Sequence, residues 1–163
     1  EGFDVAIRYS HAGSAEGTPL FEESVQPVCA PALLRRGAPP LRTPADLHAH
    51  TLLQVAVPDG SGMPLDWQSW LQSVGQGDLE PAATLTFTSL DTAVAAAIDG
   101  QGVALGRRPL IDRLLRLRKL VAPFSAETAS ARGYFLVVEP AAGRRPAVQA
   151  LAAWLLEEAR RGT

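Results

Sequence analysis

Residues 85–107, LTFTSLDTAVAAAIDGQGVALGR, follow the pattern of a strand, a helix and a second strand. Residues 85–88 are mostly β-branched or aromatic, as is typical of strands. Apolar residues then recur at helical spacing until Gly100, a residue that accepts the left-handed conformation at a helix end. Residues 103–105 form the short apolar run of a strand that is buried on both faces. The stretch therefore predicts a βαβ unit with a right-handed crossover and a parallel sheet.

The start of this helix is a candidate for ligand binding. Thr88 or Ser89 offers a hydroxyl N-cap, and Thr88 and Asp91 have the spacing of a capping box. A helix N-terminus presents backbone N–H groups and a positive dipole end, so it attracts an anion or a polar group. Because Asp91 already brings negative charge to this turn, we expect a ligand that carries an amine or a hydroxyl as well.

The composition of the whole chain argues against several classes of protein. Its 163 residues carry a net charge of −2, which gives no overall attraction to nucleic acid or to an anionic membrane. No apolar run reaches the roughly 20 residues that span a bilayer. The single cysteine, Cys29, cannot form an internal disulfide and fits a reducing compartment. These features predict a globular domain with no membrane partner.

The sequence contains no recognisable pattern for catalysis, metal binding or cofactor binding. Gly100 and Gly102 follow a helix and precede a strand, whereas a dinucleotide-binding loop follows a strand and precedes a helix. No nucleophile–base arrangement or acid–base pair can be argued from the order of residues. The histidines, which are His11, His48 and His50, lack the spacing of a metal site. We therefore expect no enzyme activity, no catalytic residue, no metal and no cofactor.

Strands and helices alternate along the rest of the chain, which predicts an α/β fold with a mostly parallel sheet. The apolar run at residues 3–7 is expected inside that sheet. Extended segments at 20–28 and 120–124 are not followed promptly by a helix, and they bracket a complete α/β block. We expect them to be crossover strands between two lobes that bind a ligand in their cleft. Other expected elements are strands at 51–55 and 134–138, a turn-rich loop at 57–64 and a helix at 66–75. A further helix is expected from Pro109, with Leu110, Leu114 and Leu117 as its buried face. The last helix is expected from Pro146, with a buried face of Val148, Leu151, Ala152 and Leu155.

Polar residues come directly after the first predicted strand, at Arg8, Tyr9 and Ser10. Ligands of open α/β sheets bind outside the carboxyl ends of the strands. The guanidinium of Arg8 can pair there with a carboxylate or phosphate of a ligand, or with Glu22 or Glu23 of the same chain. The residues leave both alternatives open.

A run of basic residues begins with Arg107. Arg107 follows a buried strand that ends at Gly106, so it is a second candidate for ligand binding at a carboxyl end. The chain is net acidic and exposed aromatics are not interleaved with the run, which disfavours nucleic-acid binding. We interpret the later members as the solvated face of a helix; they are Arg108, Arg113, Arg116, Arg118 and Lys119.

Several short motifs, taken in order, resemble the LysR-type transcriptional regulators. The motifs are residues 4–8 (DVAIR), 33–34 (LL), 43–47 (TPADL), 50–53 (HTLL), Trp67-x-x-Trp70-Leu71, 93–105 (AVAAAIDGQGVAL), 120–124 (LVAPF), 134–136 (YFL) and a closing helix with Trp154-Leu155. The tryptophan pair and the LVAPF segment look most like the branch that contains the glycine-cleavage and β-lactamase-inducer regulators. The resemblance covers nearly the whole chain.

The resemblance implies an α/β effector-binding domain of the periplasmic-binding-protein type, with two lobes joined by two crossover strands. Lobe I would comprise residues 1–28 and 124–163 and lack its first strand-helix-strand-helix, and lobe II would comprise residues 29–123. The sequence begins without Met, and we expect it to be a fragment whose winged helix-turn-helix lies elsewhere. The ligand contacts of the family carry over to Arg8, Tyr9, Ser10, Thr88, Ser89, Leu90, Asp91, Gly106, Arg107 and Tyr134.

By this resemblance the chain is expected to sense an effector for a transcription regulator. The effector would be a small molecule, such as an amino acid, a carboxylate or a muropeptide-like compound. The domain would form a homodimer or tetramer in the cytoplasm and act on promoter DNA only through the DNA-binding domain. The alternative is a solute-binding protein of the periplasmic-binding type, which would have the same architecture.

Overall fold

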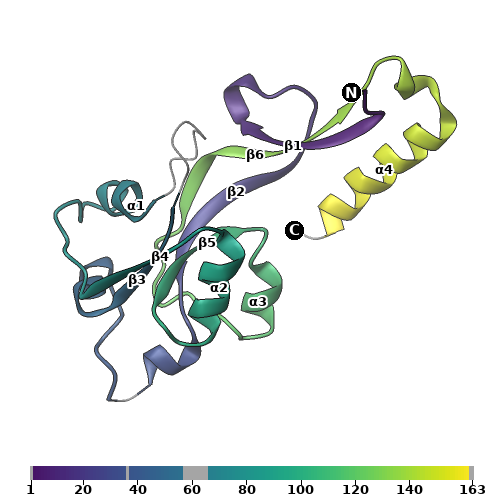
Figure 1. Cartoon of the computed structure of the whole chain (residues 1–163). Coiled ribbons are helices and arrows are strands. Elements are labelled where there is room, and N and C mark those ends of the chain that lie inside the picture. The colour runs from purple at the N-terminus through teal and green to yellow at the C-terminus, as the bar shows by residue number, and fades with distance from the viewer. Residues whose placement is uncertain (1, 36, 57–65, 162–163) are drawn as a thin grey trace. The chain divides into compact units, whose positions relative to one another are not determined.

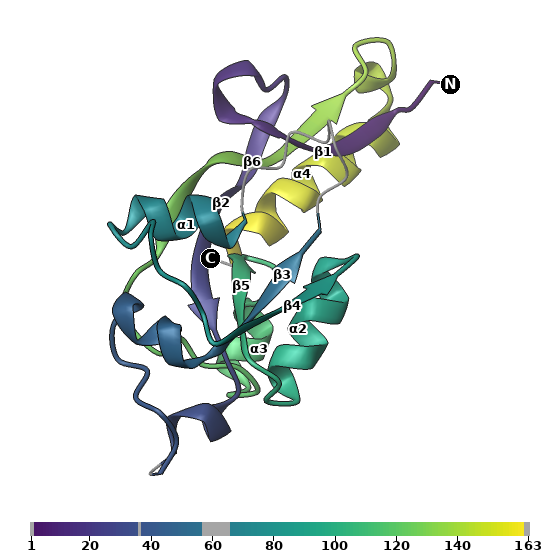
Figure 2. The same ribbon diagram turned by 60° about the vertical axis from the view of Figure 1, so that its left-hand side comes forward.

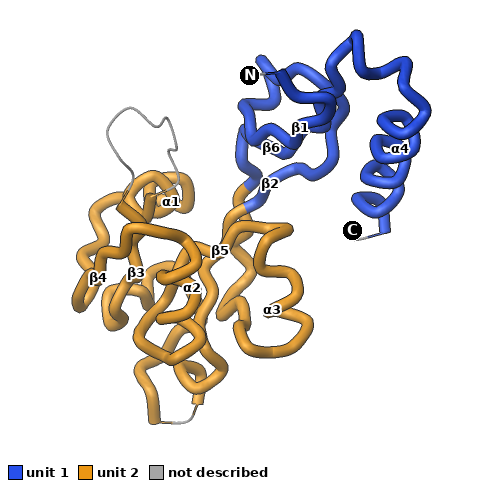
Figure 3. Tube along the Cα trace, turned by 45° about the vertical axis from the view of Figure 1, so that its right-hand side comes forward, with its two compact units in different colours: residues 1–24, 129–163 blue, residues 25–128 orange. Residues whose placement is uncertain are grey.

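The computed structural model describes residues 2–35, 37–56 and 66–161, and the loop expected at 57–64 lies outside them (Figure 1). The chain divides into two compact units (Figure 3). Unit 1 comprises Glu1–Ser24 and Ala129–Thr163, and unit 2 comprises Val25–Thr128. The chain passes from unit 1 into unit 2 within strand β2 (Thr18–Val28) and returns at the start of strand β6 (Thr128–Val138).

The sheet of unit 2 contains the predicted βαβ unit. Its strand order is β2, β5 (Val103–Arg108), β3 (Thr51–Val55) and β4 (Ala83–Phe87). Helix α2 (Leu90–Ile98) connects β4 to β5, and both strands pair in parallel with β3. The three elements and the parallel strands are therefore confirmed, but β3 lies between the two strands of the unit. The local pattern of residues 85–107 contains no information about such an insertion.

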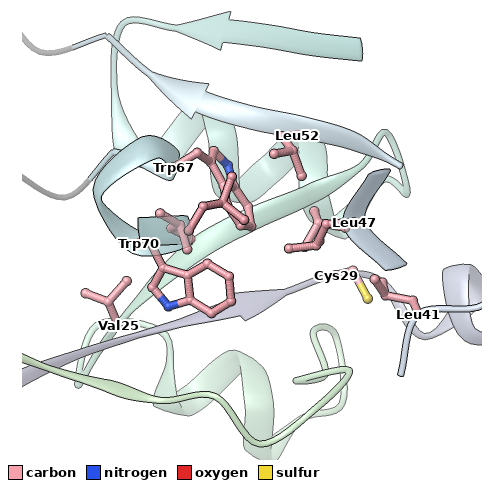
Figure 4. Close-up of a cluster of buried hydrophobic side chains, with 10 residues drawn as sticks. Val25, Cys29, Leu41, Leu47, Leu52, Trp67 and Trp70 are labelled. Atoms are coloured by element: carbon pink, nitrogen blue, oxygen red, sulfur yellow. The ribbon is translucent and has the colours of Figure 1, made fainter. Parts of the chain in front are cut away.

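Both faces of this sheet are covered, because its strands alternate their side chains between two apolar clusters. Leu52, Val103 and Leu105 belong to the cluster that also contains the tryptophans of helix α1 (Trp67–Ser73) and Leu47 of the 3-10 helix η3 (Pro44–Ala49). Figure 4 shows the two indole rings among these side chains. Leu53 and Ala104 face the other cluster, which contains Ala97 of α2 and Ile111. Helices α1 and α2 thus lie on opposite faces of the sheet (Figures 1 and 2).

The helix expected from Pro109 is shorter than predicted and buries a different residue. Helix α3 spans only Asp112–Arg116, and Leu110 and Leu117 are more than half exposed. Ile111 is fully buried instead, and its side chain would lie 2.5 Å from a Cβ at Gly106. Because Ile111 inserts against the glycine of β5, the apolar face is shifted from the one that helical spacing indicates.

The segment 120–124 was expected to be a crossover strand, and this expectation is wrong. It forms one isolated bridge, between Cys29 and Val121, and β6 is the strand that begins at the unit boundary. β6 begins six residues before the strand expected at 134–138, at Thr128. The connector after β2 contains the 3-10 helix η2 (Pro31–Leu34).

Unit 1 contains strands β1 (Val5–His11), β6 and the first part of β2, in the order β1-β6-β2. β1 pairs antiparallel with β6, so the sheet is mixed and contains antiparallel as well as parallel strands. β1 lies at the end of the strand order and leaves Ile7 54% exposed, which corrects the expectation that it lies inside the sheet. Two short 3-10 helices, η1 (Ala12–Ser14) and η4 (Ala142–Arg144), and helix α4 (Pro146–Arg161) complete the unit.

Helix α4 forms as predicted but buries less of its apolar face. Val148 is buried, whereas Leu151 is 44% exposed and Trp154 is 56% exposed. In the described part of the chain, no helix has the length and apolar character needed to cross a membrane.

One close backbone approach fixes the start of β5 against β3. A Cβ on Gly102 would lie 2.4 Å from the carbonyl oxygen of Thr51, which belongs to the backbone and cannot rotate away. We expect Gly102→Ala to lower the free energy of unfolding by about 1–3 kcal/mol, because overpacking a buried position forces the two strands apart. Urea unfolding followed by circular dichroism measures this. Gly143→Ala is the matched control, since its Cβ meets only ordinary contact at 3.5 Å from Val138; equal losses in both variants would contradict the prediction.

Candidate ligand-binding site

A pocket of about 230 Å³ lies at the carboxyl ends of the parallel strands of unit 2. These ends meet at one edge of the sheet because β3, β4 and β5 run in the same direction. In the described part of the chain, the residues that line it come from the end of β3, the start of α1, the start of α2, and β5 with the turn after it. They are Leu53, Gln54, Val55, Ala56, Trp67, Thr88, Ser89, Leu90, Ala93, Ala104, Leu105, Arg107 and Leu110.

Ser89 is the residue that caps helix α2, which decides between the two predicted N-caps. Its hydroxyl accepts a hydrogen bond from the backbone N–H of Thr92 at 3.3 Å. The Thr92 hydroxyl donates to the Ser89 carbonyl at 2.9 Å, which closes the first turn. This capped end of α2 lines the pocket and directs the positive end of the helix dipole toward it.

The remaining polar lining of the pocket is held in place by hydrogen bonds. The Gln54 amide donates to the Val55 carbonyl at 2.8 Å and accepts from the Trp67 backbone N–H at 3.1 Å. The Trp67 indole N–H donates to the Leu53 carbonyl at 3.1 Å. These bonds fix the indole as an apolar wall.

Arg107 is the one charged residue in the described lining of the pocket. The next residue of β5, Arg108, donates from Nε to Asp112 at 2.6 Å and lies 3.7 Å from Glu127. The hydrogen bond with Asp112 raises the pKa of Arg108. Neighbouring residues of a strand point to opposite sides, and Arg107 is the one of these two arginines that lines the pocket. Such a site fits a small molecule with an anionic group and a short apolar part.

A second group of predicted residues comes together in unit 1. Tyr9 of β1 is directly opposite Tyr134 of β6, and their ring centroids are 5.2 Å apart. The rings of Phe21 in β2 and Tyr134 form an edge-to-face pair whose centroids are 6.4 Å apart. The guanidinium of Arg132 lies 5.5 Å from the centre of the Tyr9 ring. The Tyr9 hydroxyl donates a 2.7 Å hydrogen bond to Glu23 of β2.

Arg8 and Ser10 do not share the face of β1 that carries Tyr9, because consecutive side chains of a strand alternate. The Arg8 guanidinium lies 5.1 Å from the centre of the Phe3 ring. An ion pair of Arg8 with Glu22 or Glu23, the alternative left open above, does not form among the described residues. Glu23 accepts from Tyr9 instead.

The structure thus sorts the predicted contacts into distinct groups. Thr88, Ser89, Leu90 and Arg107 line the pocket of unit 2, whereas Asp91 is exposed in the first turn of α2 and Gly106 is buried behind the lining. Tyr9 and Tyr134 are in contact in unit 1. That one effector uses residues of both units stays a prediction.

Sequence reasoning missed several residues of these groups. Gln54 and Leu110 line the pocket, and Trp67 is both buried and part of its wall. A lone amide at the carboxyl end of a buried strand is a signal that could have identified Gln54. Glu23 carries no such signal, because Glu22 beside it is chemically identical and exposed.

The side chains of His48 and His50 contact backbone carbonyl groups. His50 is buried and contacts the Pro40 carbonyl through Nε2 at 3.0 Å, and His48 contacts the Ala45 carbonyl through Nδ1 at 2.8 Å. Within residues 2–35, 37–56 and 66–161, no three His, Cys, Asp or Glu side chains are grouped so that they could hold a metal ion.

The fold and the pocket define an effector-binding domain of the periplasmic-binding-protein type. The chain belongs to the LysR substrate-binding domain family, whose sequence model matches residues 1–160. It is 33% identical over 159 residues to the glycine cleavage system transcriptional activator of Escherichia coli, covering 96% of this chain and 50% of that protein. It is 35% identical over 166 residues to the transcriptional activator AmpR of Pseudomonas aeruginosa, covering 98% and 51%. The chain thus spans about half the length of these relatives.

Solved structures agree with this assignment. The effector domain of AmpR from P. aeruginosa superimposes with a TM-score of 0.70 at 30% identity, covering 96% of this chain and 72% of that one. The AmpR effector-binding domain from Citrobacter freundii gives a TM-score of 0.72 at 25% identity, covering 97% and 75%. The predicted family and fold type are confirmed. These relatives are transcription regulators, which favours a regulator over a solute-binding protein and over an enzyme.

The N-cap at Ser89 supports the helix that borders the pocket. We expect Ser89→Ala to lower the free energy of unfolding by about 1 kcal/mol, because the N–H of Thr92 loses its acceptor. Ser89→Asp should restore most of this loss, since Asp is an equally good N-cap. Thr88→Ala should change stability little, because Thr88 precedes the cap. Thermal unfolding of the three variants distinguishes the residues, and a larger loss in Thr88→Ala than in Ser89→Ala would reject the assignment.

Proposed function

We propose that this chain is the effector-sensing domain of a LysR-type transcriptional regulator. It binds a small molecule in the pocket at the N-terminus of α2 and transmits this event to a DNA-binding domain of the full-length protein, which acts on promoter DNA in the cytoplasm. LysR regulators bind small-molecule effectors and oligomerise. The observation that carries the proposal is the pocket itself, which joins a capped helix N-terminus and Arg107 at the carboxyl ends of three parallel strands.

The chemistry of the pocket supports a small amphipathic effector. The dipole of α2 and the guanidinium of Arg107 favour a carboxylate. Leu53, Leu90 and Leu110 favour a short apolar part. At about 230 Å³ the pocket is smaller than the range of about 300–1,000 Å³ that is typical of drug-sized ligands. An amino acid or a small carboxylate fits this size, and a muropeptide-like compound would place only one end in it.

A thermal-shift screen of amino acids, small carboxylates and muropeptide-like compounds tests the proposal, with hits confirmed by calorimetry. We expect Ser89→Gly to weaken a hit about tenfold, because it removes the hydroxyl at the pocket while glycine keeps most of the capping energy. Arg113→Gln is the control, since Arg113 is exposed on α3. A hit with equal affinity for wild type and Ser89→Gly would place binding outside this pocket.

We also propose that the domain pairs with a second copy, as a homodimer or within a tetramer. Strand β4 supports this: it lies at the end of the strand order, residues 83–87 carry no charge, and most of its side chains are exposed. Such an edge readily accepts another chain.

Sedimentation velocity over a range of protein concentrations tests the assembly. We expect a dimer to appear as concentration rises and to weaken in Leu85→Lys, which places a charge on the exposed edge. Leu151→Lys, at an exposed position of α4 in unit 1, is the control. A monomer at every concentration would contradict the proposal for this chain.

A further inference from the structure

The basic residues of the chain are concentrated in one part of unit 2. Residues 107–119 contain six of the 15 Lys and Arg residues of the chain and one acidic residue, Asp112, which accepts from Arg108. Arg116, Arg118 and Lys119, at the end of α3, are exposed. Among the residues that the structure describes, none of these three forms an ion pair. The end of α3 is therefore a strongly basic surface on a chain that is otherwise acidic.

Hydrogen bonds of the backbone hold this surface in one conformation. The N–H of Lys119 donates to the Leu114 carbonyl and the N–H of Arg118 donates to the Leu115 carbonyl, each at 3.0 Å. This pair of bonds is the Schellman motif, in which the residue after the helix takes the left-handed conformation. Arg118 has a φ of 52° and is the one residue other than glycine with a positive φ in the described part of the chain.

Stability does not account for the residues at this helix end. Glycine is the usual residue at the position of Arg118, because a Cβ makes the left-handed conformation costly. An apolar residue is frequent at the position of Lys119, because it can pack against the last turn of the helix. A helix end carries the equivalent of about half a negative charge, which does not balance three cations. Positions that break such local rules are expected at functional surfaces.

An apolar side chain lies within this run of cations. Leu117 stands between Arg116 and Arg118 in the sequence, is 57% exposed, and belongs to neither apolar cluster of unit 2. A single exposed leucine is ordinary on a protein surface. This one is flanked on both sides by unpaired cations, so a partner that covers Leu117 also meets their charges.

We propose that residues 116–119, the α3 patch, are a docking surface for an acidic protein segment that carries a leucine-like side chain among its carboxylates. The carboxylates would pair with the three cations, and the apolar side chain would cover Leu117. None of the four residues lines the effector pocket, so the surface is independent of the proposed effector.

The composition of the patch favours a protein segment over a nucleic acid. A phosphate backbone makes no use of an exposed leucine, and residues 107–119 contain no aromatic side chain on which a base could stack. The acidic remainder of the chain also repels a long polyanion.

Fluorescence anisotropy with two labelled synthetic peptides of equal negative charge tests the docking. The alanine peptide consists of Glu and Ala, and the leucine peptide has Leu in place of two of the Ala residues. We expect the wild type to bind the leucine peptide about fivefold more tightly than the alanine peptide. Leu117→Ser should remove this preference, whereas Leu34→Ser, at a leucine of unit 2 that is 43% exposed, should keep it. Equal binding of both peptides to the wild type overturns the proposal.

The charge of the patch is tested with a matched pair of double variants. Arg116→Gln/Lys119→Gln should weaken the leucine peptide about fivefold, because two exposed ion pairs are lost. Arg35→Gln/Arg42→Gln removes the same charge from exposed positions elsewhere in unit 2 and should preserve the affinity. If both variants weaken the peptide equally, the chain attracts it only through its overall charge, and the proposal is overturned.

Arg118→Gly separates docking from stability. We expect this change to raise the Tm, because glycine takes the left-handed conformation without strain, and to weaken the leucine peptide about threefold, because one cation is lost. A higher Tm with unchanged affinity overturns the docking role of Arg118.

Three further measurements distinguish other occupants of the α3 patch. They are binding of a short DNA duplex of random sequence, binding of phosphatidylglycerol vesicles, and sedimentation velocity of the protein alone. DNA or vesicles that bind more tightly than the leucine peptide, and lose this binding in Arg116→Gln/Lys119→Gln, overturn the proposal. A dimer that this variant abolishes also overturns it, because the patch would then contact a second copy. Weaker binding of both probes and an unchanged assembly support the acidic protein segment.

Discussion

The parallel pairing of β3 with both β4 and β5 is the constraint on which the candidate site depends. Because the three strands run in one direction, their carboxyl ends and the N-terminus of α2 lie at the same edge of the sheet. At the opposite edge, Gly102 lies so near Thr51 that only a residue without a side chain fits. Tight packing at one end of the ladder thus accompanies an open pocket at the other.

The polar groups around this pocket are mostly engaged with the protein itself. Gln54 joins the end of β3 to the start of α1, and the Ser89 hydroxyl caps α2. Arg107 and the first turn of α2 bring the remaining polar groups to the lining of the pocket. A site whose walls are held in this way loses little conformational freedom when a ligand enters, which favours binding by small molecules with few contacts.

Local chemistry was sufficient to predict much of unit 2. The glycine that ends α2 has a φ of 78°, as expected for a left-handed position. The residues that line the pocket from the start of α2 followed from the same reasoning. These features depend on neighbours within a few positions of the chain, so a single sequence contains them.

Features set by distant parts of the chain could not be predicted. The insertion of β3 between β4 and β5, the burial of Ile111 against Gly106, and the hydrogen bond from Tyr9 to Glu23 each join residues whose proximity depends on strand order or on the path of a turn. β1 begins with the apolar run Val5–Ile7 but has one neighbouring strand, so the start of its sequence resembles that of an interior strand.

The three tryptophans are divided between the units in a way that makes them separate optical reporters. Trp67 and Trp70 are buried edge to face in unit 2, with ring centroids 5.6 Å apart, while Trp154 is largely exposed on α4 of unit 1. An aqueous quencher reaches Trp154 in the folded chain, but it reaches the pair only after the core of unit 2 has opened. Fluorescence emission therefore contains two components, and the one protected from the quencher reports the opening of unit 2 without any added label.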